Sequence, residues 1–265
     1  MNEGELAKNR HDLLNVLIEK VSSFSGIEGI FLGGSIAAKS EDPFSDIDLR
    51  ILLNDSYLKK EFIQLFLDDL SEIMFIETRT TSYAVIHFNN FIKLDIFVYY
   101  KSDLMPNIWL QNIFIIFDKE GFLNELKNKA KELVYRITQN EFDELLSKYF
   151  AFYHELYRRK ERKEYNYCES CTVILKNILV AFWYVELGYQ PNSLGDWSKY
   201  EGNRSKLTKF QLKYLDKCTP VLIEEIESFM KSINKETLKS IEQISNHYHL
   251  SFNKKQFIMI TSKVL

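Results

Sequence analysis

The chain has 265 residues, nearly half of them apolar, so it can bury a sizeable core, and its length suggests two domains. A net charge of −3 and a pI near 6.0 argue against a protein that holds nucleic acid through a dominant basic surface. No run reaches the roughly 18 apolar residues of a membrane span, and the N-terminus lacks the apolar core of a signal peptide, so we expect a cytoplasmic protein.

The first half of the chain predicts a sheet with flanking helices. Apolar residues recur at helical spacing over 3–23 and again over 57–70. Runs of β-branched and aromatic residues predict strands, and Asn89-Asn90 between two of them predicts a tight turn, because asparagine tolerates positive φ. The predicted strands cover 30–32, 46–53, 73–78, 83–88, 91–100 and 113–117.

Two carboxylates open the second of these strands. Alternation along a strand places Asp46 and Asp48 on the same face. Two carboxylates at one spot repel each other unless a cation lies between them. Mg²⁺ is the natural candidate, because it takes oxygen ligands from one or two carboxylates and completes its shell with water and substrate phosphates.

A glycine-rich turn lies shortly before these carboxylates. Gly33 and Gly34 let the backbone approach a phosphate without a Cβ in the way, and the hydroxyl of Ser35 can donate to phosphate oxygens. The turn and the carboxylates together predict a site for a metal–nucleotide complex.

The order and spacing of the two elements resemble the signature of the nucleotidyltransferase superfamily. Gly34-Ser35-x-Ala37 is followed by Ser45-Asp46-Ile47-Asp48-Leu49, with Asp46 eleven residues after Ser35. Within the superfamily the chain is most similar to the aminoglycoside nucleotidyltransferases, whose pattern reads G-S-x-A-x-G, a short loop and S-D-I-D-L. Lys39 stands at the second glycine of that pattern, where its ammonium could itself reach a phosphate of the nucleotide.

Asp95 is the one carboxylate in the predicted strand 91–100. A carboxylate in such an apolar strand is costly to bury without a partner. The resemblance implies that a third acidic residue at this point completes a metal triad with Asp46 and Asp48, or deprotonates the acceptor hydroxyl. The alternative is an aspartate on an edge strand that faces water.

The second half is predicted to be a helical bundle. Residues 1–118 hold 10 Lys and Arg against 18 Asp and Glu, a balance of −8, whereas residues 119–265 have a balance of +5. The change in charge coincides with the change in pattern, which predicts a catalytic domain over 1–118 and a substrate-binding domain over 119–265. The predicted helices cover 122–136, 141–162, 168–187, 209–217, 221–232, 235–249 and 253–263, with Thr219-Pro220 as one helix start.

The densest basic run lies at 158–163. It has two interpretations: a solvated helix face paired with neighbouring glutamates, or a group in which Arg158 and Arg162 hold the triphosphate of a nucleotide. Cys168 and Cys171 form a C-x-x-C without the further ligands of a structural zinc site, so we expect reduced thiols.

The expected fold is therefore α+β: a mixed sheet flanked by helices, followed by a helical bundle. The resemblance implies an Mg²⁺-dependent enzyme that moves AMP from ATP to a hydroxyl of a small acceptor, such as an aminoglycoside antibiotic, and so gives resistance. A polycationic drug should meet an acidic cleft, whereas the second half is net basic, so a lincosamide, another hydroxylated metabolite or a protein side chain stays open as acceptor.

Two other functional classes share the signature. One is a tRNA- or RNA-tailing nucleotidyltransferase, which needs a basic track for the strand and stacking aromatic side chains. The other is a nucleotide-binding sensor or antitoxin-like partner without catalysis, which Lys39 favours and the intact carboxylates oppose. The sequence gives no indication of the oligomeric state.

Overall fold

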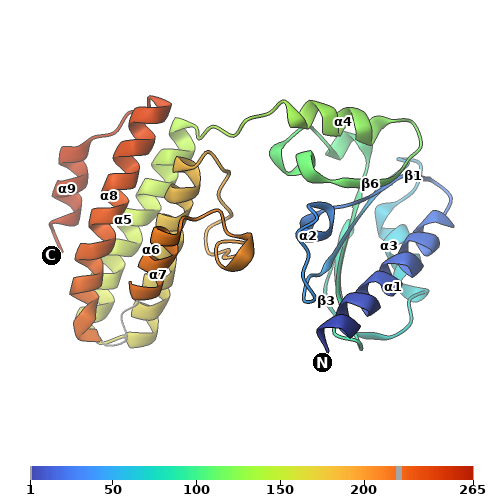
Figure 1. Ribbon diagram of the computed structural model, residues 1–265, viewed down its shortest axis with the longest axis horizontal. Helices are drawn as coiled ribbons and strands as arrows, with labels where there is room; N and C mark the ends of the chain where they lie inside the picture. The colour runs from blue at the N-terminus through green and yellow to red at the C-terminus, as the bar shows by residue number, and fades with distance from the viewer. Residues whose placement is uncertain (1, 219–222, 265) are drawn as a thin grey trace. The chain divides into compact units, whose positions relative to one another are not determined.

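The computed structural model describes residues 2–218 and 223–264, and these form two compact units (Figure 1). The first unit ends at Val134 and the second begins at Tyr135. Each is described by itself below. The expected α+β architecture, a mixed sheet with helices followed by helices alone, is confirmed.

A six-stranded sheet forms the centre of the first unit, with the strand order β3-β4-β5-β2-β1-β6. Strands β2 and β5 are parallel, and the other neighbouring pairs are antiparallel. The strands are β1 (Ile27–Leu32), β2 (Ile47–Leu53), β3 (Ile73–Arg79), β4 (Tyr83–Phe88), β5 (Lys93–Tyr99) and β6 (Phe114–Asp118). The predicted strands are confirmed to within a few residues.

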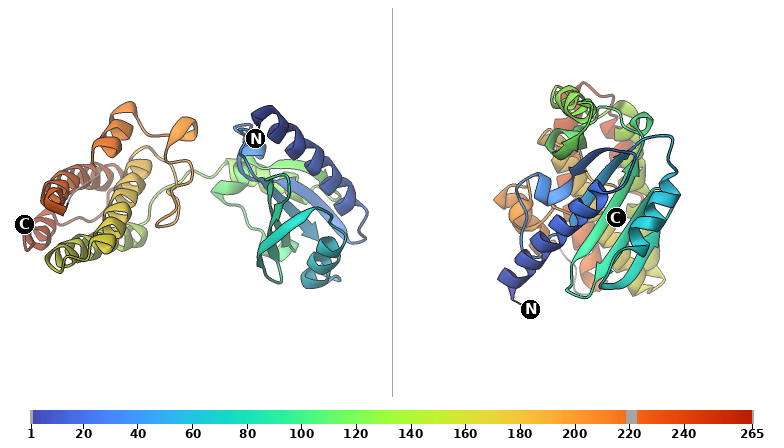
Figure 2. Two further views of the ribbon diagram at one scale, coloured as in Figure 1. Left: turned by 90° about the horizontal axis from the view of Figure 1, so that it is seen from below. Right: turned by 90° about the vertical axis from the view of Figure 1, so that its right-hand side faces the viewer.

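One face of the sheet is buried beneath two helices, α1 (Glu3–Ser22) and α3 (Lys59–Asp68), which lie on the same side in Figures 1 and 2. Apolar residues at every second position of the central strands, such as Leu49 and Ile96, are fully buried against Leu17 and Phe66 of these helices. Because side chains alternate along a strand, this burial directs the intervening polar residues of β2 and β5 to the opposite face.

The opposite face carries a second apolar cluster at one end. There, Phe31 and Leu52 pack against Leu110 and Leu123 in a separate apolar cluster. Leu110 lies in the short helix η2 (Ile108–Asn112), and Leu123 lies in α4 (Phe122–Lys131). The residues at the beginning of β2 and β5 are not part of this cluster.

The second unit is helical. Its core contains Tyr149 and Tyr153, both fully buried, and Phe150, Phe152 and Tyr157 pack against it. The helices are α5 (Gln139–Glu161), α6 (Tyr165–Glu186), η3 (Gly202–Arg204), α7 (Lys209–Lys217), η4 (Ile223–Glu225), α8 (Ile226–Tyr248) and α9 (Lys254–Thr261).

Two details of the chain differ from the sequence analysis. The division between the units lies after Val134 rather than at 118/119, because α4 packs on β6 and η2 and so belongs to the first unit. The segments 221–232 and 235–249 were predicted as two helices, but α8 runs without a break from Ile226 to Tyr248. The predicted helix start at Thr219-Pro220 lies outside the described residues.

Helix α6 is long and apolar enough to cross a membrane, judged by length and composition alone. However, 72% of its most apolar window is buried inside the protein. A core helix of a water-soluble bundle has this character, because all of its faces contact neighbouring side chains.

The N-terminus of α5 is closed by a capping box. The hydroxyl of Thr138 accepts a hydrogen bond from the backbone N–H of Glu141 at 3.2 Å, and the Glu141 carboxylate accepts one from the Thr138 N–H at 2.8 Å. We expect Thr138→Ala to lower the free energy of unfolding by about 1 kcal/mol, measured by urea denaturation. Thr138→Ser retains the hydroxyl and should unfold like the wild type; equal losses in both variants would contradict the capping role.

Candidate active site

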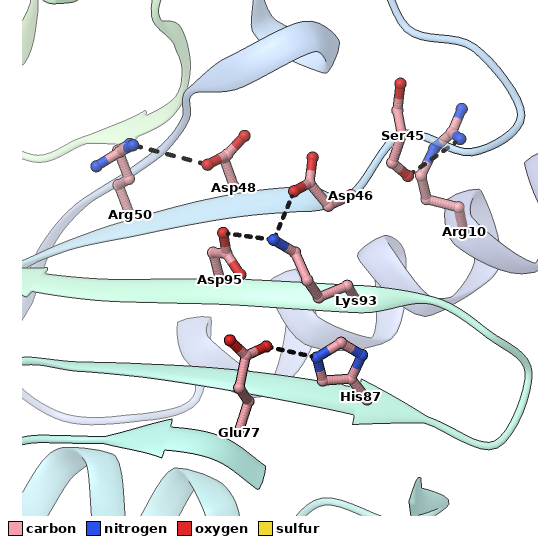
Figure 3. A network of polar contacts seen from close by, with 9 residues as sticks. All are labelled: Arg10, Ser45, Asp46, Asp48, Arg50, Glu77, His87, Lys93 and Asp95. Carbon is pink, nitrogen blue, oxygen red and sulfur yellow. Dashed lines mark hydrogen bonds and ion pairs between the residues drawn. The ribbon is translucent and has the colours of Figure 1, made fainter. Parts of the chain in front are cut away.

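Three aspartates come together at the end of the sheet where β2 and β5 begin, which we call the open end (Figure 3). Asp48 and Asp95 are paired residues of the neighbouring parallel strands β2 and β5, and Asp46 directly precedes β2. Asp46 and Asp48 lie on the same face, as the alternation predicts. The strand order therefore brings Asp95 to the two carboxylates of the signature, although 46 residues separate it from Asp48 in the sequence.

A lysine lies among these aspartates. The Lys93 ammonium is 2.9 Å from Oδ2 of Asp46 and 3.1 Å from Oδ2 of Asp95, so it bridges the two carboxylates (Figure 3). Within the part of the chain that the structure describes, no group of three or more Asp, Glu, His or Cys side chains is close enough together to hold a metal ion as it stands. Lys93 is the cation that contacts Asp46 and Asp95, while Asp48 lies 3.7 Å from Arg50.

Burial sets the electrostatics of the site. The side chains of Asp48 and Asp95 are each 18% exposed. Burial raises the pKa of Asp48 above its ordinary value, the charge of Asp46 raises it further, and Arg50 partly opposes both. Burial likewise raises the pKa of Asp95, and Lys93 partly offsets this. Ionising all of these carboxylates is therefore unfavourable without added positive charge.

The glycine turn lies directly against Asp48. Gly34 begins the short helix α2 (Gly34–Ala37) with a φ of +60°, and a Cβ at this position would overlap Oδ2 of Asp48. Only glycine permits both the backbone conformation and this close approach. The hydroxyl of Ser35, the next residue of the turn, is buried without a hydrogen-bond partner among the described residues, so it retains an unused donor.

Two features shape the loop between α2 and Asp46. Lys39 adopts a left-handed φ of +53°, so a lysine takes the conformation that a glycine adopts freely. Arg10 of α1 is buried and donates to the backbone carbonyls of Asp42 at 2.6 Å and Ser45 at 3.4 Å. Since Asp46 follows Ser45, Arg10 fixes the entry of the chain into β2.

Arg50 continues the same face of β2. Its guanidinium lies between two aromatic rings, 4.5 Å from the ring centroid of Phe97 and 4.7 Å from that of Trp109. It donates to the hydroxyl of Tyr99 at 2.7 Å and lies 3.7 Å from Asp48. These contacts hold a fixed positive charge on the far side of Asp48 from Lys93.

The basic run of α5 belongs to the second unit. Arg158 and Arg159 both pair with Glu155, and Lys160 pairs with Glu227. These contacts agree with the interpretation of the run as a solvated, ion-paired face. Arg162 directly follows α5 as its C-cap and is exposed. The roles of Arg158 and Arg162 in holding a triphosphate remain predictions.

The donor set fits a hard divalent cation. All three side chains offer carboxylate oxygens, which Mg²⁺ prefers. Oδ1 of Asp95 is buried without a hydrogen-bond partner among the described residues, so it has a free lone pair in the site. Lys93 shows that a positive charge is accommodated between Asp46 and Asp95.

Carboxylates from parallel strands beside a glycine turn define a site for handling nucleotide phosphates. Residues 14–164 match the model of the family described as "Nucleotidyltransferase domain". Because the match covers more than half of the chain, the protein belongs to the nucleotidyltransferase domain family and is a nucleotidyltransferase. Members of this family generally use a nucleoside triphosphate and a divalent metal ion.

Comparison with solved structures finds 11 similar chains, two of which are described here. An aminoglycoside 6-adenyltransferase from Bacillus subtilis has 13% identity and a TM-score of 0.47, covering 94% of this chain and 95% of that chain. A nucleotidyltransferase-like protein from Exiguobacterium sibiricum has 11% identity and a TM-score of 0.41, covering 94% and 84%. A search of curated proteins found no significant sequence match.

Three residues of the site were missed in the sequence analysis: Arg10, Arg50 and Lys93. Arg50 and Lys93 follow the alternation of Asp46, Asp48 and Asp95, so the strand pattern already contained a signal for them. Arg10 gives no such signal, because its contact with the loop depends on the packing of α1.

Proposed function

We propose that this enzyme transfers a nucleoside monophosphate, AMP from ATP, to a hydroxyl group of a small molecule in an Mg²⁺-dependent reaction. The observation that carries the proposal is the pairing of Asp48 with Asp95 on neighbouring parallel strands, beside Asp46 and the glycine turn. This arrangement gathers several acidic oxygens next to backbone that a phosphate can approach closely.

The aspartates take two roles in this proposal. Asp46, Asp48 and Asp95 would hold Mg²⁺, which in such sites neutralises phosphate charge and stabilises the attacking and leaving oxygens. In the alternative role, Asp95 would not bind the ion but would accept the proton of the acceptor hydroxyl, and Asp46 and Asp48 would hold Mg²⁺. The hydroxyl oxygen then attacks the α-phosphorus, and pyrophosphate leaves.

The glycine turn and several cations would hold the triphosphate. Gly33 and Gly34 allow close approach of the phosphates, and the unpaired hydroxyl of Ser35 would donate to one of their oxygens. Lys39 is exposed next to this turn and would add positive charge. Arg158 and Arg162 are proposed, from the sequence, to hold phosphates of the nucleotide.

The acceptor is proposed to be a small hydroxylated molecule, with aminoglycosides as the leading class, on the strength of the resemblance of the signature. The second unit contributes one supporting feature. A cavity of about 730 Å³ is lined by Glu141, Asp143 and Glu144 against a single lysine, Lys148. This local acidity is what a polycationic acceptor needs, even though the unit as a whole is net basic.

The reaction is proposed to take place in the cytoplasm. The three cysteines, Cys168, Cys171 and Cys218, are free and buried. Unpaired thiols suit a reducing compartment.

The test is a transfer assay with Mg²⁺ and each labelled nucleoside triphosphate. The acceptor panel contains aminoglycosides, lincosamides and tRNA. Label on an aminoglycoside or lincosamide together with pyrophosphate release supports the proposal, whereas label on tRNA alone would replace it with an RNA-tailing enzyme. Tight binding of ATP without turnover on any acceptor would favour a second candidate, a nucleotide-binding protein without catalysis, which the lysine bridge at Asp46 and Asp95 supports.

A further inference from the structure

Lys93 reaches the site through the register of two strands. Ile47 pairs with Leu94 across β2 and β5, which places Lys93 beside Asp46 at the open end of the sheet. Lys93 and Asp95 are two residues apart on one strand and therefore share a face. The lysine thus contacts one aspartate of its own strand and one of the neighbouring strand, at 3.1 and 2.9 Å.

The other charged groups on this face have separate partners. Arg50 is held between Phe97 and Trp109 and approaches only Asp48 closely. On the next strand His87 pairs with Glu77 at 2.8 Å (Figure 3). Among the residues shown there, Lys93 is the one that pairs with both Asp46 and Asp95.

We propose that Lys93 is an internal counter-cation that occupies the position required by the divalent ion and must leave before the ion binds. This inference rests on the proposed metal site and adds that Lys93 and the metal ion compete for the same position between Asp46 and Asp95. An ammonium and a metal ion cannot both lie between the same two carboxylates, because like charges at such distances repel strongly. Lys93 therefore offsets part of the negative charge of the metal-free site and makes metal binding weak until a nucleotide adds its own phosphate ligands.

The experiment measures Mn²⁺ binding to the full chain without nucleotide, by electron paramagnetic resonance. We expect Lys93→Met to bind Mn²⁺ at least about tenfold more tightly than the wild type, because a charge within a few ångströms shifts an ionic equilibrium by roughly one to three powers of ten. Lys101→Met is the matched control. Lys101 also bridges two carboxylates of the first unit, Glu28 and Glu120, at 3.2 and 2.6 Å, and it lies outside the aspartate site.

A second readout is thermal unfolding in a chelator and in Mg²⁺. In the chelator, Lys93→Met should have a lower melting temperature than the wild type, because its carboxylates have lost their cation. Addition of Mg²⁺ should raise the melting temperature of Lys93→Met by more than that of the wild type. Addition of Mg²⁺ should raise the melting temperature of Lys101→Met by as much as that of the wild type.

The outcomes separate this inference from the proposed function. If Lys93→Met binds Mn²⁺ no more tightly than the wild type, and Asp95→Asn abolishes the binding, the proposed competition is wrong. The proposed metal site is then still supported. Binding that is absent from every variant, even with ATP present, would overturn both. Tighter binding in Lys93→Met but not in Lys101→Met supports the competition.

Discussion

Replacing Asp48 by Asn is expected to lower turnover by on the order of a thousandfold. Asparagine keeps the size and shape of the side chain but removes the negative charge that would hold the metal ion. Stabilisation by a metal ion is worth several kcal/mol in the transition state, and each 1.36 kcal/mol is about tenfold in rate. The measurement is pyrophosphate release with the acceptor found in the panel, together with Mg²⁺-dependent binding of ATP, which should also be lost.

The same variant should be at least as stable as the wild type in the absence of metal. The raised pKa of Asp48 means that its ionised form is less favourable in the folded protein than in the unfolded chain, chiefly because of burial and then because of Asp46. A neutral side chain avoids this cost at neutral pH. Asp55→Asn, an exposed position just after the other end of β2, is the control and should keep both activity and stability. Retained turnover in Asp48→Asn would contradict the assignment of the site.

Much of the first unit could be predicted from the sequence because its patterns are local. The two elements of the signature lie within 31–53, so their spacing already indicates which side chains meet. Leu94, Ile96 and Val98 alternate with Asp95 and Phe97 and form the buried face of β5. This alternation is visible in the sequence, since it depends only on neighbouring residues.

The parts that could not be predicted depend on contacts between distant segments. Lys93 meets Asp46 only because β5 pairs in parallel with β2 in one particular register. Arg10 reaches the loop before Asp46 because α1 packs across the sheet, and a lone arginine in an amphipathic helix gives no hint of that contact. Register and packing are set by the whole core, so these residues become visible only in the folded chain.

The predicted boundary between the two units, at 118/119, differs from the observed one for a similar reason. The sequence changes from strands to helices near residue 118, and the first helix after that point looks like the beginning of the bundle. Leu123 and Leu126 of α4, however, complete the apolar cluster against Phe31 and Leu52 of the sheet. Secondary structure alone does not say which core a helix joins, because an amphipathic face fits any apolar surface.

Gly34→Ala is expected to reduce turnover by about a hundredfold or more, through geometry rather than charge. The new Cβ would overlap Oδ2 of Asp48, so either this carboxylate or the turn must move. Reacting groups must be held within a fraction of an ångström, and a misplacement of about 1 Å can cost this much in rate. The variant should also lose roughly 1–2 kcal/mol of stability, because alanine is strained at a φ of +60°. Turnover and urea denaturation measure the two effects.

Gly121→Ala separates the two causes. Gly121 has a φ of +78°, but a Cβ there would meet nothing within 4 Å. This variant therefore carries the backbone strain without the overlap, and we expect it to lose stability while its turnover stays close to that of the wild type. If both variants lost activity to the same degree, strain in the backbone would explain the effect. If only Gly34→Ala did so, the close approach of the turn to Asp48 is what the site requires, and the glycine is present to keep that carboxylate in place.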